Sequence, residues 1–250
     1  MMKKILAAAV LMLAMSAAQS FGFTLQSGYE GQIKLNISGV TQNVTNGETW
    51  GLFKLDSVRY GTTSSSSVAV NDVYGIIYGL SDYDVNYPMG TANLKGGYFA
   101  LYEVNPSKTV IYDPTKYVSG TGQYTGITDG TLLLGGAFAK GILGDDTTVQ
   151  QQGNMVAGVF NGFGAALGNV TGGTLFNAFN TDGITSYYTQ STYDLKFDIT
   201  VFGDDDHLWS QDFNSGVKGN VVPEPGTMAL LGFGMLGLAI FGKRRMNREA

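Results

Sequence analysis

The 250-residue sequence contains no cysteine, one histidine and few charged side chains, which make up 14% of the chain. Without cysteine the chain can form no disulfide, no thiolate metal site and no cysteine nucleophile. His207 is the sole histidine, and no Gly-x-Ser-x-Gly elbow accompanies it. Zinc sites generally need more than one His or Cys. We therefore expect a non-enzymatic protein with no catalytic residue and no zinc.

Positive charge is scarce outside the two chain ends. Residues 1–18 and 243–250 hold six of the 15 basic residues but one of the 20 acidic ones, so the remainder carries nine positive and 19 negative charges. A surface with this balance repels phosphate backbones. Nucleic acid is therefore excluded as the expected partner.

Glycine is abundant: its 36 positions are about twice the average usage. Between the glycines lie short runs that alternate apolar and polar side chains or are rich in β-branched and aromatic residues, as β-strands do. The predicted strands are 33–38, 50–60, 73–80, 98–104, 131–139 and 193–202. Residues 144–153 are predicted to form a loop. Residues 154–178 fit either strands that pack through glycine or a short helix near Ala165. We predict an all-β fold, a single jelly-roll-like β-sandwich over residues 21–215.

The N-terminus has the three parts of a secretory signal. Lys3 and Lys4 precede an apolar run, and small residues follow at 16–18. The run is too short to span a bilayer permanently. Residues 1–20 are therefore predicted to be a signal peptide, with an exported body behind it.

The C-terminus carries a second three-part segment. After a glycine-bearing linker predicted at 216–222 comes the stiff, extended motif of Pro223, Glu224 and Pro225, within residues 223–226. Residues 227–242 contain no charge and are predicted to form a transmembrane helix. Sixteen helical residues rise about 24 Å, short of the ~30 Å hydrocarbon core, which makes the span a marginal anchor.

A basic tail, residues 243–250, completes this segment. Lys243, Arg244 and Arg245 follow the apolar run directly, and positive charge there holds that end in the cytoplasm. The body and Glu224 would then face outward.

The order of motif, hydrophobic helix and basic cluster over residues 223–250 resembles the PEP-CTERM sorting signal of Gram-negative bacteria. The resemblance implies recognition by exosortase, an integral membrane cysteine protease-transpeptidase, and removal of the helix during sorting. It also implies an association with exopolysaccharide-producing, biofilm-forming species. The resemblance is limited to the tail, so the body inherits no activity from it.

Two features of the body suggest ligands. Asp204, Asp205 and Asp206 are candidates for a calcium site, as are Asp82 with Asp84 and Asp145 with Asp146, although solvated aspartates in turns explain all three groups equally well. Several of the fourteen tyrosines could form flat platforms for sugar rings, and ordinary strand propensity is the competing explanation. The platform candidates are Tyr74, Tyr78, Tyr83, Tyr87, Tyr98 and Tyr102.

From these observations we expect an exported protein that is anchored in the inner membrane during sorting and then resides at the cell surface or in the extracellular matrix. The body would be structural or adhesive. The alternatives are an exopolysaccharide-binding module and a secreted hydrolase. No cofactor is expected apart from the calcium considered above.

Overall fold

The alternating runs of the sequence become long antiparallel strands. The computed structural model describes residues 25–26, 29–44, 48–61, 67–86, 90–105, 126–156, 159–203, 211–222 and 235. Its longer elements are β1 (Gly31–Val44), β2 (Glu48–Tyr60), β4 (Val73–Asn86), β5 (Thr91–Glu103), β6 (Thr131–Ala139), β7 (Val149–Val156), β8 (Val159–Gly172), β11 (Leu195–Phe202) and β12 (Gln211–Val221). The shorter ones are β3 (Ser67–Ala69), α2 (Phe176–Phe179), β9 (Ile184–Thr185) and β10 (Thr192–Tyr193).

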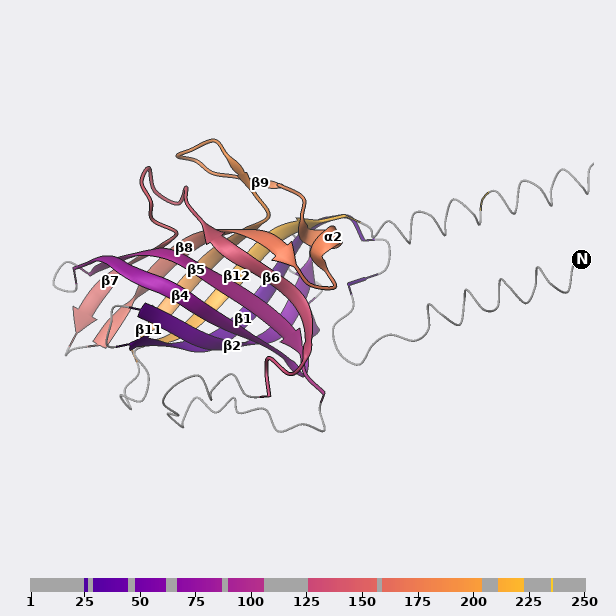
Figure 1. Cartoon of the computed structure of the whole chain (residues 1–250), viewed down its shortest axis with the longest axis horizontal. Helices are drawn as coiled ribbons and strands as arrows, with labels where there is room; N and C mark the ends of the chain where they lie inside the picture. Colours follow the sequence, from indigo (N-terminus) through magenta and orange to yellow (C-terminus); the bar gives the residue numbers. More distant parts are fainter. Residues whose placement is uncertain are drawn as a thin grey trace, which may run out of the picture.

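The main sheet closes on itself. Its hydrogen-bonded order is β1-β12-β11-β8-β6-β5-β4-β2, and β2 pairs again with β1, so these strands form a barrel-like ring (Figure 1). The all-β prediction is confirmed, but the two-sheet sandwich is wrong. Side chains alternate between core and solvent in both architectures, and the alternation in the sequence cannot distinguish them.

β6 and β7 lie one after the other along the same position of the ring, between β5 and β8. β5 pairs with β6 through Tyr98–Glu103 and with β7 through Thr91–Leu94, and β8 likewise pairs with both. The chain leaves the sheet between them, over residues 140–148, and then returns. Residues 149–153, which the glycine-rich sequence places in a loop, therefore belong to the sheet.

Two further boundaries differ from the sequence-based expectation. Residues 216–221, predicted to be a linker, form the second half of β12, where Val217 and Val221 are buried and pair with β1. In β2 the inward side chains are Phe53, Leu55 and Val58, because a bulge at the Asp56 position shifts the register by one residue. Such a bulge explains the imperfect alternation of this run.

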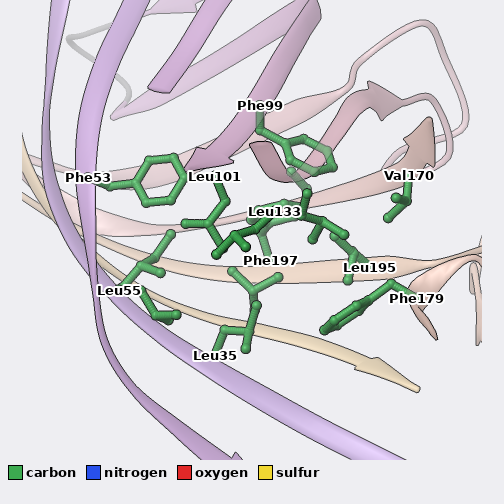
Figure 2. Close-up of a cluster of buried hydrophobic side chains, with 14 of the residues drawn as sticks. Leu35, Phe53, Leu55, Phe99, Leu101, Leu133, Val170, Phe179, Leu195 and Phe197 are labelled. Carbon is green, nitrogen blue, oxygen red and sulfur yellow. The ribbon is translucent and has the colours of Figure 1, made fainter. Parts of the chain in front are cut away.

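Aromatic rings fill the interior of the ring of strands (Figure 2). Phe99 of β5, Phe138 of β6 and Phe197 of β11 lie with their ring centroids 5.2 to 5.3 Å apart, in edge-to-face or tilted contacts. Inward-facing glycines make room for them. A Cβ at Gly136 would overlap both the Phe99 ring and the Asn169 carbonyl oxygen, and a Cβ at Gly75 would overlap the ring of Phe53. Large and small residues thus alternate across the interior, as in other small barrels.

A second, smaller apolar cluster lies on the outer face of β1, β2, β4 and β5. The register aligns Val40, Leu52, Ile76 and Ala100 in one cross-strand row, and all four are buried. Ile127, in the turn before β6, is fully buried against them.

One buried carboxylate joins the chain after α2 to the sheet. Asp194 is 2% exposed and accepts backbone N–H bonds from Val170, Thr181 and Asp182 at 2.8 to 2.9 Å. The three backbone donors satisfy both side-chain oxygens of this buried residue. This contact fixes the segment between α2 and the β9–β10 hairpin, which stands clear of the sheet in Figure 1.

The close approach at Gly136 can be tested by substitution. Gly136→Ala should lower the free energy of unfolding by about 1 to 3 kcal/mol, because the backbone of β8 and the Phe99 ring must move. Gly172→Ala is the matched control: nothing lies within 4 Å of its added Cβ. It should be neutral or stabilising by up to about 1 kcal/mol. Urea denaturation of the full chain, followed by tryptophan fluorescence, measures both, and equal effects would contradict the packing described.

Candidate functional site

A shallow groove of about 350 Å³ crosses the outer face of β7, β8 and β11. Outward side chains from two adjacent cross-strand rows line it. The first row contains Gln152, Phe163 and Thr200, and the second contains Gln150, Ala165 and Asp198. Because Ala165 is small, the second row is low in its middle, between a glutamine and an aspartate.

Phe163 is the prominent apolar group of the groove. Its side chain is 63% exposed. Phe202, two residues beyond the Phe163 partner Thr200 on β11, is 42% exposed on the same outer face. Water-exposed phenylalanine rings are unfavourable unless something covers them. Amide, hydroxyl and carboxylate groups surround this ring, and together they can both donate and accept hydrogen bonds.

A row of basic side chains borders the groove. Lys196 of β11 is directly opposite Lys218 of β12, Lys218 is opposite Lys34 of β1, and Lys34 is opposite Arg59 of β2. Asp198 reaches back from the groove to this basic row, with its oxygens 3.1 Å from Lys196 Nζ and 2.6 Å from Lys218 Nζ.

The charge state of Asp198 follows from these contacts. Burial acts to raise the pKa of Asp198, but hydrogen bonds from Lys218 and Lys196 outweigh it and hold the pKa below its ordinary value of 3.8. The carboxylate is therefore ionised at neutral pH and available as an acceptor.

The tyrosine platforms predicted from the sequence gather on the outer face of β4 and β5. Tyr78 and Tyr98 are cross-strand partners whose rings stack, with centroids 5.3 Å apart and planes 23° apart. Tyr74 and Tyr102 are also partners, half-buried against the outer apolar cluster. Each ring of the Tyr78–Tyr98 stack covers one face of the other, so this pair offers a ligand less flat surface than Phe163 does. Tyr83 and Tyr87 have side chains outside the described residues.

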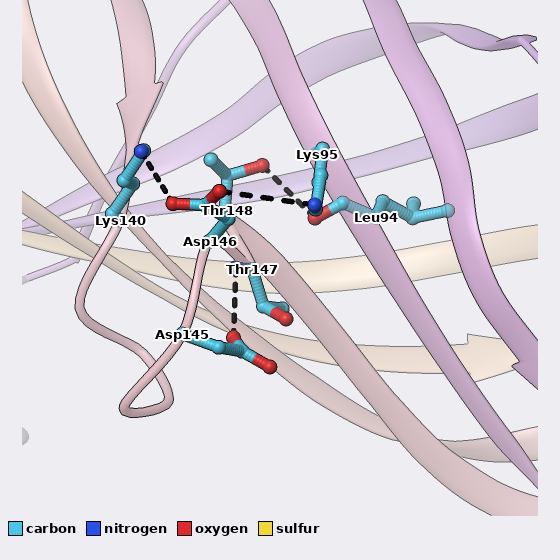
Figure 3. A network of polar contacts seen from close by, with 7 residues as sticks. All are labelled: Leu94, Lys95, Lys140, Asp145, Asp146, Thr147 and Thr148. Atoms are coloured by element: carbon cyan, nitrogen blue, oxygen red, sulfur yellow. Dashed lines mark hydrogen bonds and ion pairs between the residues drawn. The ribbon is translucent and has the colours of Figure 1, made fainter.

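Asp145 and Asp146, one of the three calcium candidate groups, lie in the excursion between β6 and β7 (Figure 3). The side chains of Asp82 and Asp84 lie outside the described residues. The Asp146 carboxylate pairs with Lys140 and, at 3.8 Å, with Lys95 of β5. Asp145 accepts a 2.9 Å hydrogen bond from the backbone N–H of Thr147. These contacts fasten the excursion to β5, aided by Thr148, whose hydroxyl donates to the carbonyls of Leu94 and Gly96. Within the described ranges no group of three His, Asp or Glu side chains could hold a metal ion.

The other residues singled out by the sequence lie outside the described residues. They are the sorting motif Pro223, Glu224 and Pro225, the basic cluster Lys243, Arg244 and Arg245, the aspartates Asp204, Asp205 and Asp206, and His207. Residues 1–20 and, apart from Met235, residues 227–242 also lie outside them. No helix among the described residues is both long enough and apolar enough to cross a membrane.

Sequence reasoning missed the groove. Phe163 stands in the glycine-rich stretch that fitted either strand or helix, and Gln150 and Gln152 stand in a segment expected to be a loop. Apolar or small residues at every second position from 163 to 167 indicate a strand face. Nothing in that pattern distinguishes an exposed phenylalanine from a buried one.

The fold and groove define an all-β protein with an open, mixed aromatic and polar surface site. Residues 221–245 match the family model described as the PEP-CTERM protein-sorting motif. The recognition made from the sequence is therefore confirmed for the C-terminal region, and the motif indicates an exported protein that exosortase sorts and processes. No curated protein and no solved structure matches the chain.

The match begins on the last residue of the folded body. Val221 is 2% exposed at the end of β12, and the backbone N–H of Val222 donates to the Ala178 carbonyl at 3.1 Å. The sorting motif thus follows the last strand without the spacer that the sequence led us to expect.

The Asp198 cluster gives a pH-dependent prediction. Because the folded pKa of Asp198 is depressed, its ion pairs stabilise the fold above the unfolded pKa of about 4, and this contribution is lost as pH falls through the folded value. Carboxyl ¹³C NMR titration should show that the pKa of Asp198 lies below its ordinary value. Lys218→Gln should raise its pKa, whereas Lys140→Gln should not. A titration of Asp198 at the ordinary value in the parent protein would contradict the cluster.

Proposed function

We propose that the body is a non-catalytic adhesive domain that binds extracellular polysaccharide in the groove between β7, β8 and β11. The C-terminal signal would deliver it to the cell surface or the extracellular matrix of a biofilm. During sorting, residues 227–242 would hold it in the inner membrane.

The exposed ring of Phe163 is the observation that carries this proposal. A sugar ring has an apolar face and an edge of hydroxyl groups, so it suits an exposed aromatic face with hydrogen-bonding groups around it. Gln150 and Gln152 can each donate and accept, Thr200 can do both, and Asp198 accepts.

The scaffold favours such binding. The groove residues stand on paired strands rather than on free loops, so little backbone entropy is lost when a ligand settles. The groove is open, which lets a polymer lie across it instead of ending in a closed pocket. An adhesive protein needs this arrangement, because it must hold chains of indefinite length.

A purely structural body without a ligand remains the second candidate, supported by the filled aromatic interior and the closed sheet, which leaves few edges for unwanted pairing. Calcium at Asp204, Asp205 and Asp206 is proposed as an accessory to either role. These residues join β11 to β12 in the sequence, and an oxygen-bound ion would brace that connection.

The binding proposal predicts the effect of one substitution. Phe163→Ala should lower the affinity of the full chain for a bound polysaccharide by about tenfold, because the ring supplies the apolar contact. Tyr187→Ala is the matched control, since Tyr187 is 85% exposed but stands in the turn between β9 and β10. Calorimetric titration against a panel of neutral and acidic polysaccharides in mild detergent measures both. Absence of binding to every member of the panel would refute the proposal.

The sorting proposal predicts the mature C-terminus. Mass spectrometry of the protein from its exporting host should find a C-terminus within residues 223–226, with residues 227–250 removed. Replacing Pro223 and Pro225 by alanine should leave the tail intact, because the recognised peptide loses its fixed extended shape. An intact tail on the parent protein in the surface fraction would contradict processing.

A further inference from the structure

We infer that the groove selects acidic polysaccharide, and that Lys34 and Arg59 form the subsite that receives a carboxylate of the sugar chain. The inference rests on the proposed function and adds the chemical class of the ligand.

The cross-strand register is the first support. Each of the three pairings along the basic row sets one positive side chain directly opposite another, an arrangement that destabilises a sheet. Asp198 forms ion pairs with both Lys196 and Lys218. Within the described part of the chain no carboxylate pairs with Lys34 or Arg59. Among the described residues, the end of the row formed by β1 and β2 therefore carries positive charge without a paired carboxylate.

The position of Lys34 connects this charge to the groove. A Cβ at Gly216 would lie 2.7 Å from Lys34 Nζ and would overlap Lys34 Cε, so the lysine side chain lies across the Gly216 backbone. Gly216 is directly opposite Asp198, a groove residue. The ammonium group therefore sits in the same cross-strand row as Asp198, one strand further round the ring. With strands about 4.8 Å apart, it lies on the order of 10 Å from the β8 strand that carries Phe163.

Arg59 provides an unused donor next to Lys34. Its Nε atom is buried and has no hydrogen-bond partner among the described residues. A buried donor without a partner is costly, and a carboxylate is the acceptor that a guanidinium group binds best. Because Nε is covered by protein atoms, a bound carboxylate would pair with the two outer nitrogens of the guanidinium group, and its negative charge would offset the positive charges of Arg59 and Lys34.

The net negative charge of the body favours binding of an acidic polymer at the basic row rather than elsewhere on the surface. With nine positive and 19 negative side chains between residues 18 and 243, most of the surface repels an acidic polymer. The basic row is a local reversal of that sign, and such a reversal steers an anionic chain to one place. Asp198, which lies in the same cross-strand row as the Lys34 ammonium group, is already paired with two lysines.

The test uses two polymers with the same sugar backbone, polygalacturonate and its methyl ester; methylation of the carboxyl groups removes their negative charge. We expect the full chain to bind the acid at least about tenfold more tightly than the ester at about 20 mM salt, and this preference to shrink at about 150 mM. Lys34→Gln and Arg59→Gln should each lower the affinity for the acid by about threefold to tenfold and leave that for the ester unchanged.

Two further variants separate position from charge. Gly216→Ala displaces the Lys34 side chain without changing net charge, and it should also reduce the preference for the acid. Lys95→Gln removes the same charge from β5, which β2 and β4 separate from β1 on one side of the ring, and should leave the preference intact. Melting temperatures show whether each variant is folded.

Three results would overturn the inference. The first is equal affinity of the parent protein for acid and ester, and the second is a loss of affinity for the acid in Lys95→Gln as large as that in Lys34→Gln. The third is binding of inorganic polyphosphate that is as tight as binding of the acid and is unaffected by Phe163→Ala. If the ester binds as well as the acid and depends on Phe163, the proposed function stands and only the acidic selection fails. If no polysaccharide binds, the proposed function fails as well.

Discussion

The rings of Phe99, Phe138 and Phe197 meet inside the closed sheet, and the packing of the interior depends on that contact. They come from β5 and β6, which are neighbours in the ring of strands, and from β11, which β8 separates from β6. Gly136 and Gly168 let the rings approach the backbone, where any larger residue would hold the strands apart. The high glycine content is thus a packing requirement of an aromatic interior, and it gives a chain without disulfides a dense core.

Closing the sheet also creates the outer surface on which function is proposed. Most inward positions are apolar or glycine, and the outward positions of β7, β8, β11 and β12 carry amides, charges and an exposed phenylalanine. The same closure brings β1 beside β12, which sets Lys34 opposite Lys218 and lays its side chain over Gly216. Asp198 therefore connects the groove, which it lines, to the basic row, two of whose lysines it pairs with. The residues of the basic row come from both ends of the body's sequence.

Strand positions could be read from local pattern where one face is buried. Thr131–Ala139 is reproduced to the residue, and the alternation of Leu195, Phe197 and Val201 identifies β11. The pattern failed where glycine or bulges interrupt it, as at residues 149–153 and at Asp56. It also failed at Gly216–Val221, where glycines that allow close packing resembled a flexible linker. Glycine has no side chain to report which role it plays.

The sequence by itself determined the all-β class and the C-terminal sorting motif, because alternation and the order of a linear signal are properties of neighbouring residues. Only the tertiary structure decided that the sheet closes, that Phe163 is exposed beside Gln150 and Gln152, and that four basic residues from four strands stand in one row. Those features depend on strand register between residues as far apart as Lys34 and Lys218. A shift of one residue in that register would turn each of these side chains to the opposite face.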